Sequence, residues 1–147
     1  LLHSEPFARG WNVFIGNVRE KLSLDPKLRE LGMCGVAVLN GAEYEFFHHA
    51  PPFLKAGGTQ EQVDAMRQLG QKQFNPNCFN DLEKDTLELT TQMTRDIKVD
   101  PKLMERLQKA LGSTAVVELV GVIASYNMVS RFLIALDINP EDHPPTA

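Results

Sequence analysis

Apolar residues recur at intervals of three and four along most of this chain, which is the spacing of one face of an α-helix. One clear run begins after Asp25-Pro26, ends at Asn40-Gly41, and has as its apolar positions Leu28, Leu31, Cys34 and Val38. Asp accepts hydrogen bonds from the first backbone N–H groups of a helix, and Pro suits its first turn. Because no stretch alternates in the manner of a strand, the pattern predicts an all-α fold.

Capping residues and glycines divide the rest of the chain into further predicted helices. Their expected ranges are 42–57, 59–71, 80–97, 101–112 and 116–136. Thr59-x-x-Gln62 and Asn80-x-x-Glu83 are capping boxes, in which two side chains satisfy each other's backbone N–H groups. Pro51-Pro52 is expected to kink the helix that contains it or to split off its last turn. The last range is rich in β-branched residues, but its length favours a buried helix over a strand.

Length and composition fit a single soluble globular domain spanning residues 1–147, with 43% hydrophobic and 23% charged residues. The net charge of −4 disfavours binding to nucleic acid or to an anionic membrane, since both require a basic surface. The apolar stretch 116–124 is far shorter than the roughly 20 residues that cross a bilayer. The chain starts at Leu1 without a signal-peptide pattern, so the expected compartment is the cytoplasm.

The segment around two adjacent histidines carries the first candidate chemistry. Glu45 and His49 are four residues apart, so on a helix they share a face and are within hydrogen-bonding reach. A carboxylate beside an imidazole raises its basicity, as a general acid or base near neutral pH requires. Glu30 lies in an otherwise apolar helix, where a buried carboxylate needs a partner such as an imidazolium. The alternative is that Glu45 and His49 form a solvated surface pair and that Glu30 is exposed. His48 belongs to the neighbouring face and is a candidate substrate contact.

The last predicted helix offers a second group of polar residues within an apolar sequence: Glu118, Tyr126, Asn127 and Arg131. Arg131 is a candidate anchor for a substrate carboxylate, because a guanidinium binds a carboxylate through two parallel hydrogen bonds. The alternative is that Glu118 or Asp137 neutralises Arg131 and that the group only fixes helix packing.

Other chemistries lack their motifs in this sequence. The one Glu-x-x-His pair, Glu45 and His48, has no second copy, so we expect no metal site. No glycine-rich phosphate loop or Walker lysine is present, and we expect no cofactor. Cys34 and Cys78 are too far apart in sequence to suggest a zinc site or a disulfide scaffold.

Three segments together resemble the carboxymuconolactone decarboxylase family of the alkyl hydroperoxidase D-like superfamily. They are Leu-Arg-Glu-Leu at 28–31, Gly-Ala-Glu-Tyr-Glu-Phe-Phe-His-His at 41–49, and Lys-Ala-Gly-Gly-Thr at 55–59. The segment 125–132 is similar to the final helix of longer members. The resemblance implies an alkyl hydroperoxidase D-like bundle of about six helices that forms a homo-oligomer, usually a trimer or hexamer.

The two branches of the superfamily differ at Ala42 and Glu45, where the peroxidase branch has its two redox cysteines. A thiol peroxidase needs a thiolate and a resolving partner, so this activity is disfavoured. The decarboxylase branch has Glu at the position of Glu45 and His at that of His49. There the resemblance implies cofactor-independent decarboxylation of a small carboxylated lactone, with His49 as acid and base, Glu45 orienting it, and Glu30 as a second carboxylate. This chain departs from the decarboxylases after residue 70 and adds two helices, which leaves the substrate open.

Three functions therefore remain from the sequence. The first is a lyase that decarboxylates a small carboxylic acid or lactone. The second is an isomerase, hydrolase or dehydratase of the same fold, because proton transfer beside a carbonyl uses the same groups. The third is a non-catalytic oligomeric binding protein that has kept the fold.

Overall fold

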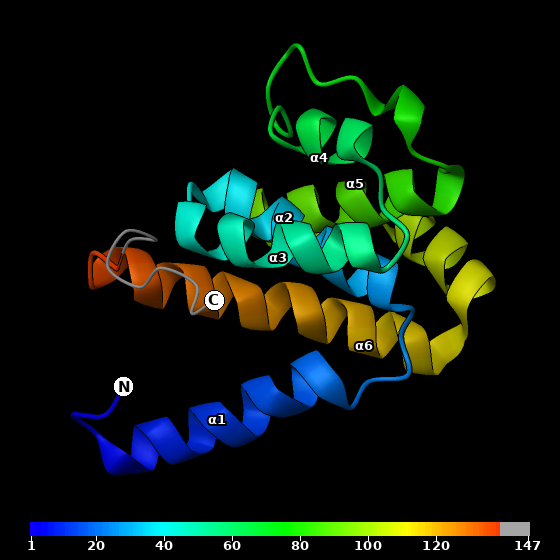
Figure 1. Ribbon diagram of the computed structural model, residues 1–147. Coiled ribbons are helices and arrows are strands. Elements are labelled where there is room, and N and C mark those ends of the chain that lie inside the picture. Colours follow the sequence, from blue (N-terminus) through cyan, green and yellow to red (C-terminus); the bar gives the residue numbers. More distant parts are fainter. Residues whose placement is uncertain (139–147) are drawn as a thin grey trace.

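The computed structural model describes residues 1–138, and these form six α-helices and one short 3₁₀ helix without any strand (Figure 1). The helices are α1 (Glu5–Glu20), α2 (Pro26–Asn40), α3 (Glu43–Lys55), α4 (Gln60–Met66), η1 (Pro76–Cys78), α5 (Asp81–Arg95) and α6 (Pro101–Ala135). The predicted all-α class is confirmed. Residues 139–147, the end of the predicted domain, lie outside the described residues.

The predicted starts of α2, α4 and α5 are confirmed by their caps. The Asp25 side chain accepts a hydrogen bond from the Lys27 backbone at 2.7 Å, with Pro26 in the first turn of α2. Both capping boxes form, at the starts of α4 and α5. Gly41 ends α2 with φ 67° and ψ 27°, a left-handed conformation that glycine adopts at little cost.

Helix α2 lies at the centre of the bundle and packs against α3, α5 and α6 (Figure 1). Its side chains Leu31, Met33 and Val36 are fully buried. Gly35 lets α5 approach closely, since a Cβ at this position would lie 3.0 Å from the Cγ2 atom of Thr90. The packing of α2 against α3 is the contact that later brings the candidate acid and base groups together.

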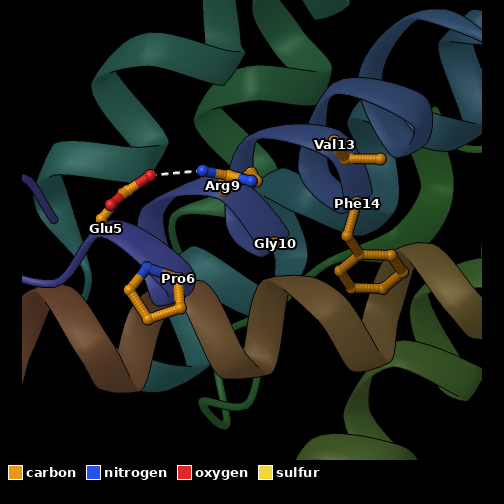
Figure 2. Close-up of a pocket in the computed structure, with 6 residues that line it drawn as sticks. All are labelled: Glu5, Pro6, Arg9, Gly10, Val13 and Phe14. Atoms are coloured by element: carbon orange, nitrogen blue, oxygen red, sulfur yellow. Dashed lines mark hydrogen bonds and ion pairs between the residues drawn. The ribbon is translucent and has the colours of Figure 1, made fainter.

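Helix α1 was not among the predicted elements. It lies along α6, where the rings of Phe7 and Trp11 pack on Phe132 at centroid distances of 5.5 and 4.9 Å. Its outer side leaves Val13 and Phe14 exposed (Figure 2). Because the sequence did not predict α1, it also did not predict the residues that α1 contributes to the candidate site.

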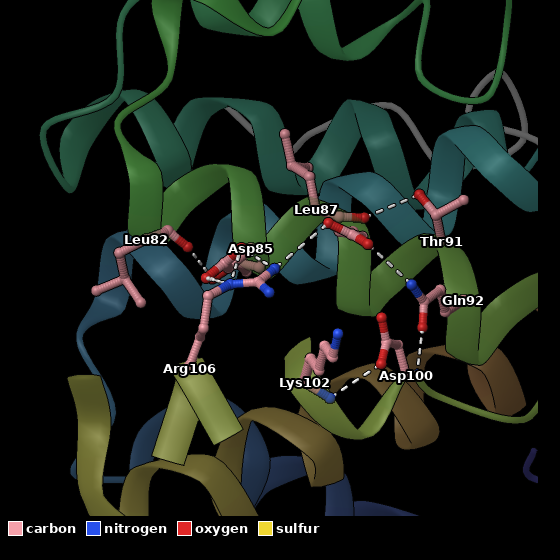
Figure 3. A network of polar contacts seen from close by, with 10 residues as sticks. Leu82, Asp85, Leu87, Thr91, Gln92, Asp100, Lys102 and Arg106 are labelled. Atoms are coloured by element: carbon pink, nitrogen blue, oxygen red, sulfur yellow. Dashed lines mark hydrogen bonds and ion pairs between the residues drawn. The ribbon is translucent and has the colours of Figure 1, made fainter. Parts of the chain in front are cut away.

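A polar network joins α5 to the start of α6 (Figure 3). Arg106 donates two hydrogen bonds to the carboxylate of Asp85, at 3.0 and 2.9 Å. The side-chain oxygen of Gln92 accepts from the backbone N–H of Asp100, the residue that caps α6. The network is exposed, so its ion pairs add little stability, but its hydrogen bonds define how the chain turns from α5 into α6.

Two predicted helix ends differ in the structure. Helix α3 continues through Pro51 and Pro52 to Lys55, so the expected split of its last turn is wrong. Both prolines are exposed, where water can replace the backbone hydrogen bond that each cannot donate. Helix α4 ends at Met66 and gives way to turns, rather than reaching residue 71.

Helix α6 combines the last two predicted helices. Gly112, with φ 79° and ψ 169°, interrupts it where the sequence predicted a boundary. Among the described helices, α6 alone has the length and apolar composition to cross a membrane. The core helix of a soluble protein has the same composition, and Leu119, Val122 and Ile123 of α6 are fully buried against the rest of the bundle.

Candidate active site

Glu30, Glu45 and His49 meet between α2 and α3. The Nδ1 atom of His49 lies 2.7 Å from Oε2 of Glu30, and its Nε2 atom lies 3.2 Å from Oε2 of Glu45. The three residues are only 5%, 3% and 7% exposed. The alternative of a solvated surface pair is therefore wrong, and the imidazole lies between two buried carboxylates.

The local sequence explains this arrangement. Glu45 and His49 are one turn apart on α3, so their side chains lie one above the other on the same helix face. Glu30 comes from the second turn of α2, and close packing of α2 on α3 brings its carboxylate to the far ring nitrogen. Arg29 adds a longer ion pair to Glu30 at 3.4 Å.

The two carboxylates favour the protonated form of His49. Burial by itself lowers the pKa of His49, but the contacts with Glu30 and Glu45 raise it, and the net pKa lies above the ordinary histidine value. The cause is the opposite charge in contact with each ring nitrogen. His49 is therefore suited to donate a proton near neutral pH.

The contacts on the two sides of the ring differ. The contact with Glu30 has the length of a charge-assisted hydrogen bond. The Oε2 atom of Glu45 approaches Nε2 without hydrogen-bond alignment, and it has no hydrogen-bond partner among the described residues. A buried carboxylate oxygen without a partner is uncommon. It leaves Oε2 of Glu45 able to accept a proton from the neighbouring imidazolium.

Two further residues extend the site toward α1. The ring of Tyr126 meets His49 edge to face, with centroids 4.9 Å apart. Its hydroxyl accepts a hydrogen bond from Nε of Arg19 at 2.7 Å. Burial raises the pKa of Tyr126, so its hydroxyl stays neutral. Of the polar residues predicted on the last helix, Tyr126 is the one in contact with His49.

A cavity of about 230 Å³ adjoins this cluster, between α1, α3 and α6. Most of its lining is apolar or aromatic, and its charged members are Arg19 and Glu45. Its other lining residues are Leu1, Trp11, Tyr44, Val129, Phe132, Leu133 and Ile138. Glu45 belongs both to the cavity wall and to the His49 cluster, so it links the cavity to the imidazole behind it.

A larger hollow lies on the outer face of α1 and is unrelated to this cluster (Figure 2). It is lined by residues of α1 alone, and its one ion pair joins the exposed side chains of Glu5 and Arg9. A surface made by a single helix face cannot enclose a small molecule, so this hollow carries no chemistry.

The remaining predicted site residues have other contacts. Arg131 is exposed and donates to Oδ1 of Asn127 at 2.6 Å, while Asn127 donates to Thr94. Glu118 accepts hydrogen bonds from the backbone N–H groups of Ser23 and Leu24, at 3.1 and 2.7 Å, and so fixes the loop between α1 and α2. Arg131 and Glu118 are thus engaged away from the cavity wall.

His48 faces away from the His49 cluster. Its ring lies 4.4 Å from that of Tyr44 and edge-on to Phe47. Its Nε2 atom is buried without a hydrogen-bond partner among the described residues. In the described part of the chain, no three His, Cys, Asp or Glu side chains are arranged to hold a metal ion.

Sequence reasoning missed Arg19 and Trp11, the two residues that α1 contributes to the cavity wall. The signal for α1 was present, because Ala8, Trp11, Ile15 and Val18 recur at helical spacing. Ala8, Ile15 and Val18 are its buried residues.

Comparison with known proteins agrees with the motif. Residues 5–70 match the model of the carboxymuconolactone decarboxylase family. The resemblance inferred from the sequence is confirmed over this region, which is just under half of the chain and contains Arg19, Glu30, Glu45 and His49. A search of curated proteins found no match. At the level of the family, the match supports a function like that of carboxymuconolactone decarboxylases or alkyl hydroperoxidase D-like proteins.

Proposed function

We propose that this chain is a lyase that decarboxylates a small carboxylated lactone or a related acid, with His49 as its proton source. The observation that carries the proposal is the buried imidazole between Glu30 and Glu45, one of which lines a cavity. A protonated imidazole beside a small apolar cavity is suited to protonating carbon after CO₂ has left.

The proposed reaction has two steps. The C–C bond to the departing carboxylate breaks heterolytically, CO₂ leaves, and the bonding electron pair passes into the conjugated lactone. The resulting carbanion takes a proton that originates on Nε2 of His49 and passes through the carboxylate of Glu45. Solvent then restores the proton to the enzyme.

Each of the three side chains has a separate part in this scheme. Glu30 accepts the hydrogen bond of Nδ1 at 2.7 Å and so holds the ring with Nε2 toward Glu45. Glu45 reaches the cavity and has an oxygen free of hydrogen bonds among the described residues. His49 lies behind it and stores the proton, because both neighbouring carboxylates favour its charged form.

The test is CO₂ release from γ-carboxymuconolactone, measured in the presence of a chelator for the unmodified chain, His49→Gln and His3→Gln. We expect release by the unmodified chain and the His3 variant, and a loss of about 10²- to 10⁴-fold in His49→Gln. The His3 variant is the matched control, since it removes an exposed imidazole outside the site.

Other outcomes would favour the remaining functions. Conversion of the lactone without CO₂ would indicate an isomerase, hydrolase or dehydratase that uses the same acid and base. No conversion by a folded protein would remove this substrate and contradict the proposal as stated.

The proposal includes self-association and a cytoplasmic location. Self-association is supported by the family resemblance and by the apolar residues that α1 exposes, with Val13 63% and Phe14 48% exposed. Size-exclusion chromatography with light scattering would give the number of subunits, and a monomeric mass at micromolar concentration would contradict it.

A further inference from the structure

We propose that Arg19 is the anion anchor of the cavity, binding a carboxylate that the substrate keeps throughout the reaction. The inference deepens the proposed function and rests on it for the reaction, but the binding of a carboxylate can be tested without turnover. It assigns to Arg19 the part that the sequence suggested for Arg131.

The bonding of Arg19 leaves it available to a ligand. Its Nε donates to the Tyr126 hydroxyl at 2.7 Å, which fixes the plane of the guanidinium at the cavity wall. Within residues 1–138, no carboxylate forms an ion pair with Arg19, whereas Arg9, Arg29 and Arg106 each have at least one. The terminal nitrogens of an oriented guanidinium are the preferred partner of a carboxylate.

The charge at the cavity wall also favours a cation, because Glu45 would otherwise be the one charged side chain among the lining residues. Behind the cavity wall, Glu30 already has an ion pair with Arg29, whereas the carboxylate of Glu45 lines the cavity and would repel an anionic substrate. Burial lowers the pKa of Arg19, but contact with Tyr126 raises it, and Glu45 and Glu30 raise it further, so that the net pKa lies above the ordinary arginine value. Arg19 balances Glu45 at the wall and places a positive charge where the anion would bind.

The size and walls of the cavity restrict what else the ligand contains. Its volume of about 230 Å³ is below the usual range of roughly 300–1,000 Å³ for small-molecule sites. Trp11 and Phe132, 4.9 Å apart between centroids, provide aromatic walls beside Val129 and Leu133. The cavity therefore fits a single small ring that bears a carboxylate.

The chemistry decides which carboxylate Arg19 binds. A carboxylate that leaves as CO₂ loses its negative charge in the transition state, so an ion pair with it would stabilise the ground state and slow the reaction. An ion pair with a carboxylate that stays on the substrate stabilises the bound substrate and the transition state equally. Arg19 should therefore govern the KM, while His49 governs the kcat.

Binding can be measured through Trp11, because it is the only tryptophan of the sequence and lies in the cavity wall. The probe is furan-2-carboxylate, with the neutral furan-2-carboxamide as its isostere. We expect saturable quenching by the carboxylate in the unmodified chain and at least tenfold weaker binding of the amide. Arg19→Gln should weaken carboxylate binding at least tenfold, and Arg19→Lys should restore part of it.

Three further variants make the test decisive. Arg9→Gln is the matched control, because Arg9 is an exposed arginine of the same helix outside the cavity, and it should bind as the unmodified chain does. His49→Gln should still bind the carboxylate but not turn over substrate, which separates failure of the anchor from failure of the proposed reaction. The proposal is overturned if the probe does not bind, if acid and amide bind equally, or if Arg131→Gln abolishes binding while Arg19→Gln does not.

Discussion

Replacing Glu30 by glutamine removes one negative charge from behind His49 while keeping the size of the side chain and an oxygen for the Nδ1 hydrogen bond. The present contact is 2.7 Å long and buried. A hydrogen bond to a charged group contributes about 1.5–3 kcal/mol and a neutral one about 1 kcal/mol, so the imidazolium should lose about 0.5–2 kcal/mol of stabilisation. That corresponds to a fall of about 2- to 30-fold in the ratio of protonated to neutral His49 at a given pH.

The assay is an NMR titration of the labelled His49 ring in Glu30→Gln, together with urea unfolding and turnover. The titration should move to lower pH, and the kcat should fall in the pH range where the variant has lost the proton. Glu83→Gln is the matched control. Glu83 is also a buried carboxylate, 3% exposed, but its partners are Lys27 at 2.6 Å and Gln62 at 2.9 Å.

The control separates general destabilisation from an effect on the imidazole. Both variants should unfold at lower urea concentration, but only Glu30→Gln should shift the His49 titration. If the titration is the same in the unmodified chain and in Glu30→Gln, the carboxylate does not hold the proton on His49, and the reasoning about the site is refuted.

Three other predictions follow from the structure. The raised pKa of His49 contributes stability that is fully present below about pH 6.5, the pKa of the unfolded chain, and that is lost as pH rises through the folded pKa. The urea concentration at the unfolding midpoint should therefore fall with rising pH more in the unmodified chain than in His49→Gln. Cys78 should react with a thiol reagent in the native protein, while the fully buried Cys34 should react only on unfolding, as counted by absorbance; equal rates would contradict this. Gly58→Ala should cost about 1–3 kcal/mol in chemical unfolding, because its Cβ would lie 2.3 Å from the ring of Phe53, and unchanged stability would show that the ring moves freely.

The elements with strong local signals were predictable from the sequence. The capping boxes at Thr59 and Asn80 and the Asp-Pro start of α2 placed three helix starts correctly, because a cap is satisfied by residues within one turn. Prolines gave a misleading signal in α3. A proline weakens a helix by local loss of a hydrogen bond, but tertiary packing of α3 on α2 outweighed that loss.

The site was predictable only where its residues share a helix face. The pair Glu45 and His49 follows from spacing alone. The position of Glu30 against Nδ1 depends on how α2 packs on α3, and that of Arg19 on how α1 lies along α6, so neither distance follows from helical periodicity. Arg131 was predicted as the anchor because it lies in an apolar sequence, yet it is exposed and bound to Asn127.

The same carboxylates that favour the protonated form of His49 oppose thiol chemistry in this bundle. Cys34 lies one turn after Glu30 on α2. Burial raises the pKa of its thiol, and Glu30 and Glu45 raise it further, while Arg67 acts in the opposite sense. A peroxidatic cysteine needs the reverse environment, in which positive charge stabilises the thiolate. By the resemblance, the peroxidase branch has a cysteine at the position of Glu45. The glutamate therefore does more than replace a thiol. It adds a negative charge that favours a proton on His49 and disfavours a thiolate at Cys34, so the charges of this site favour acid–base catalysis over peroxide reduction.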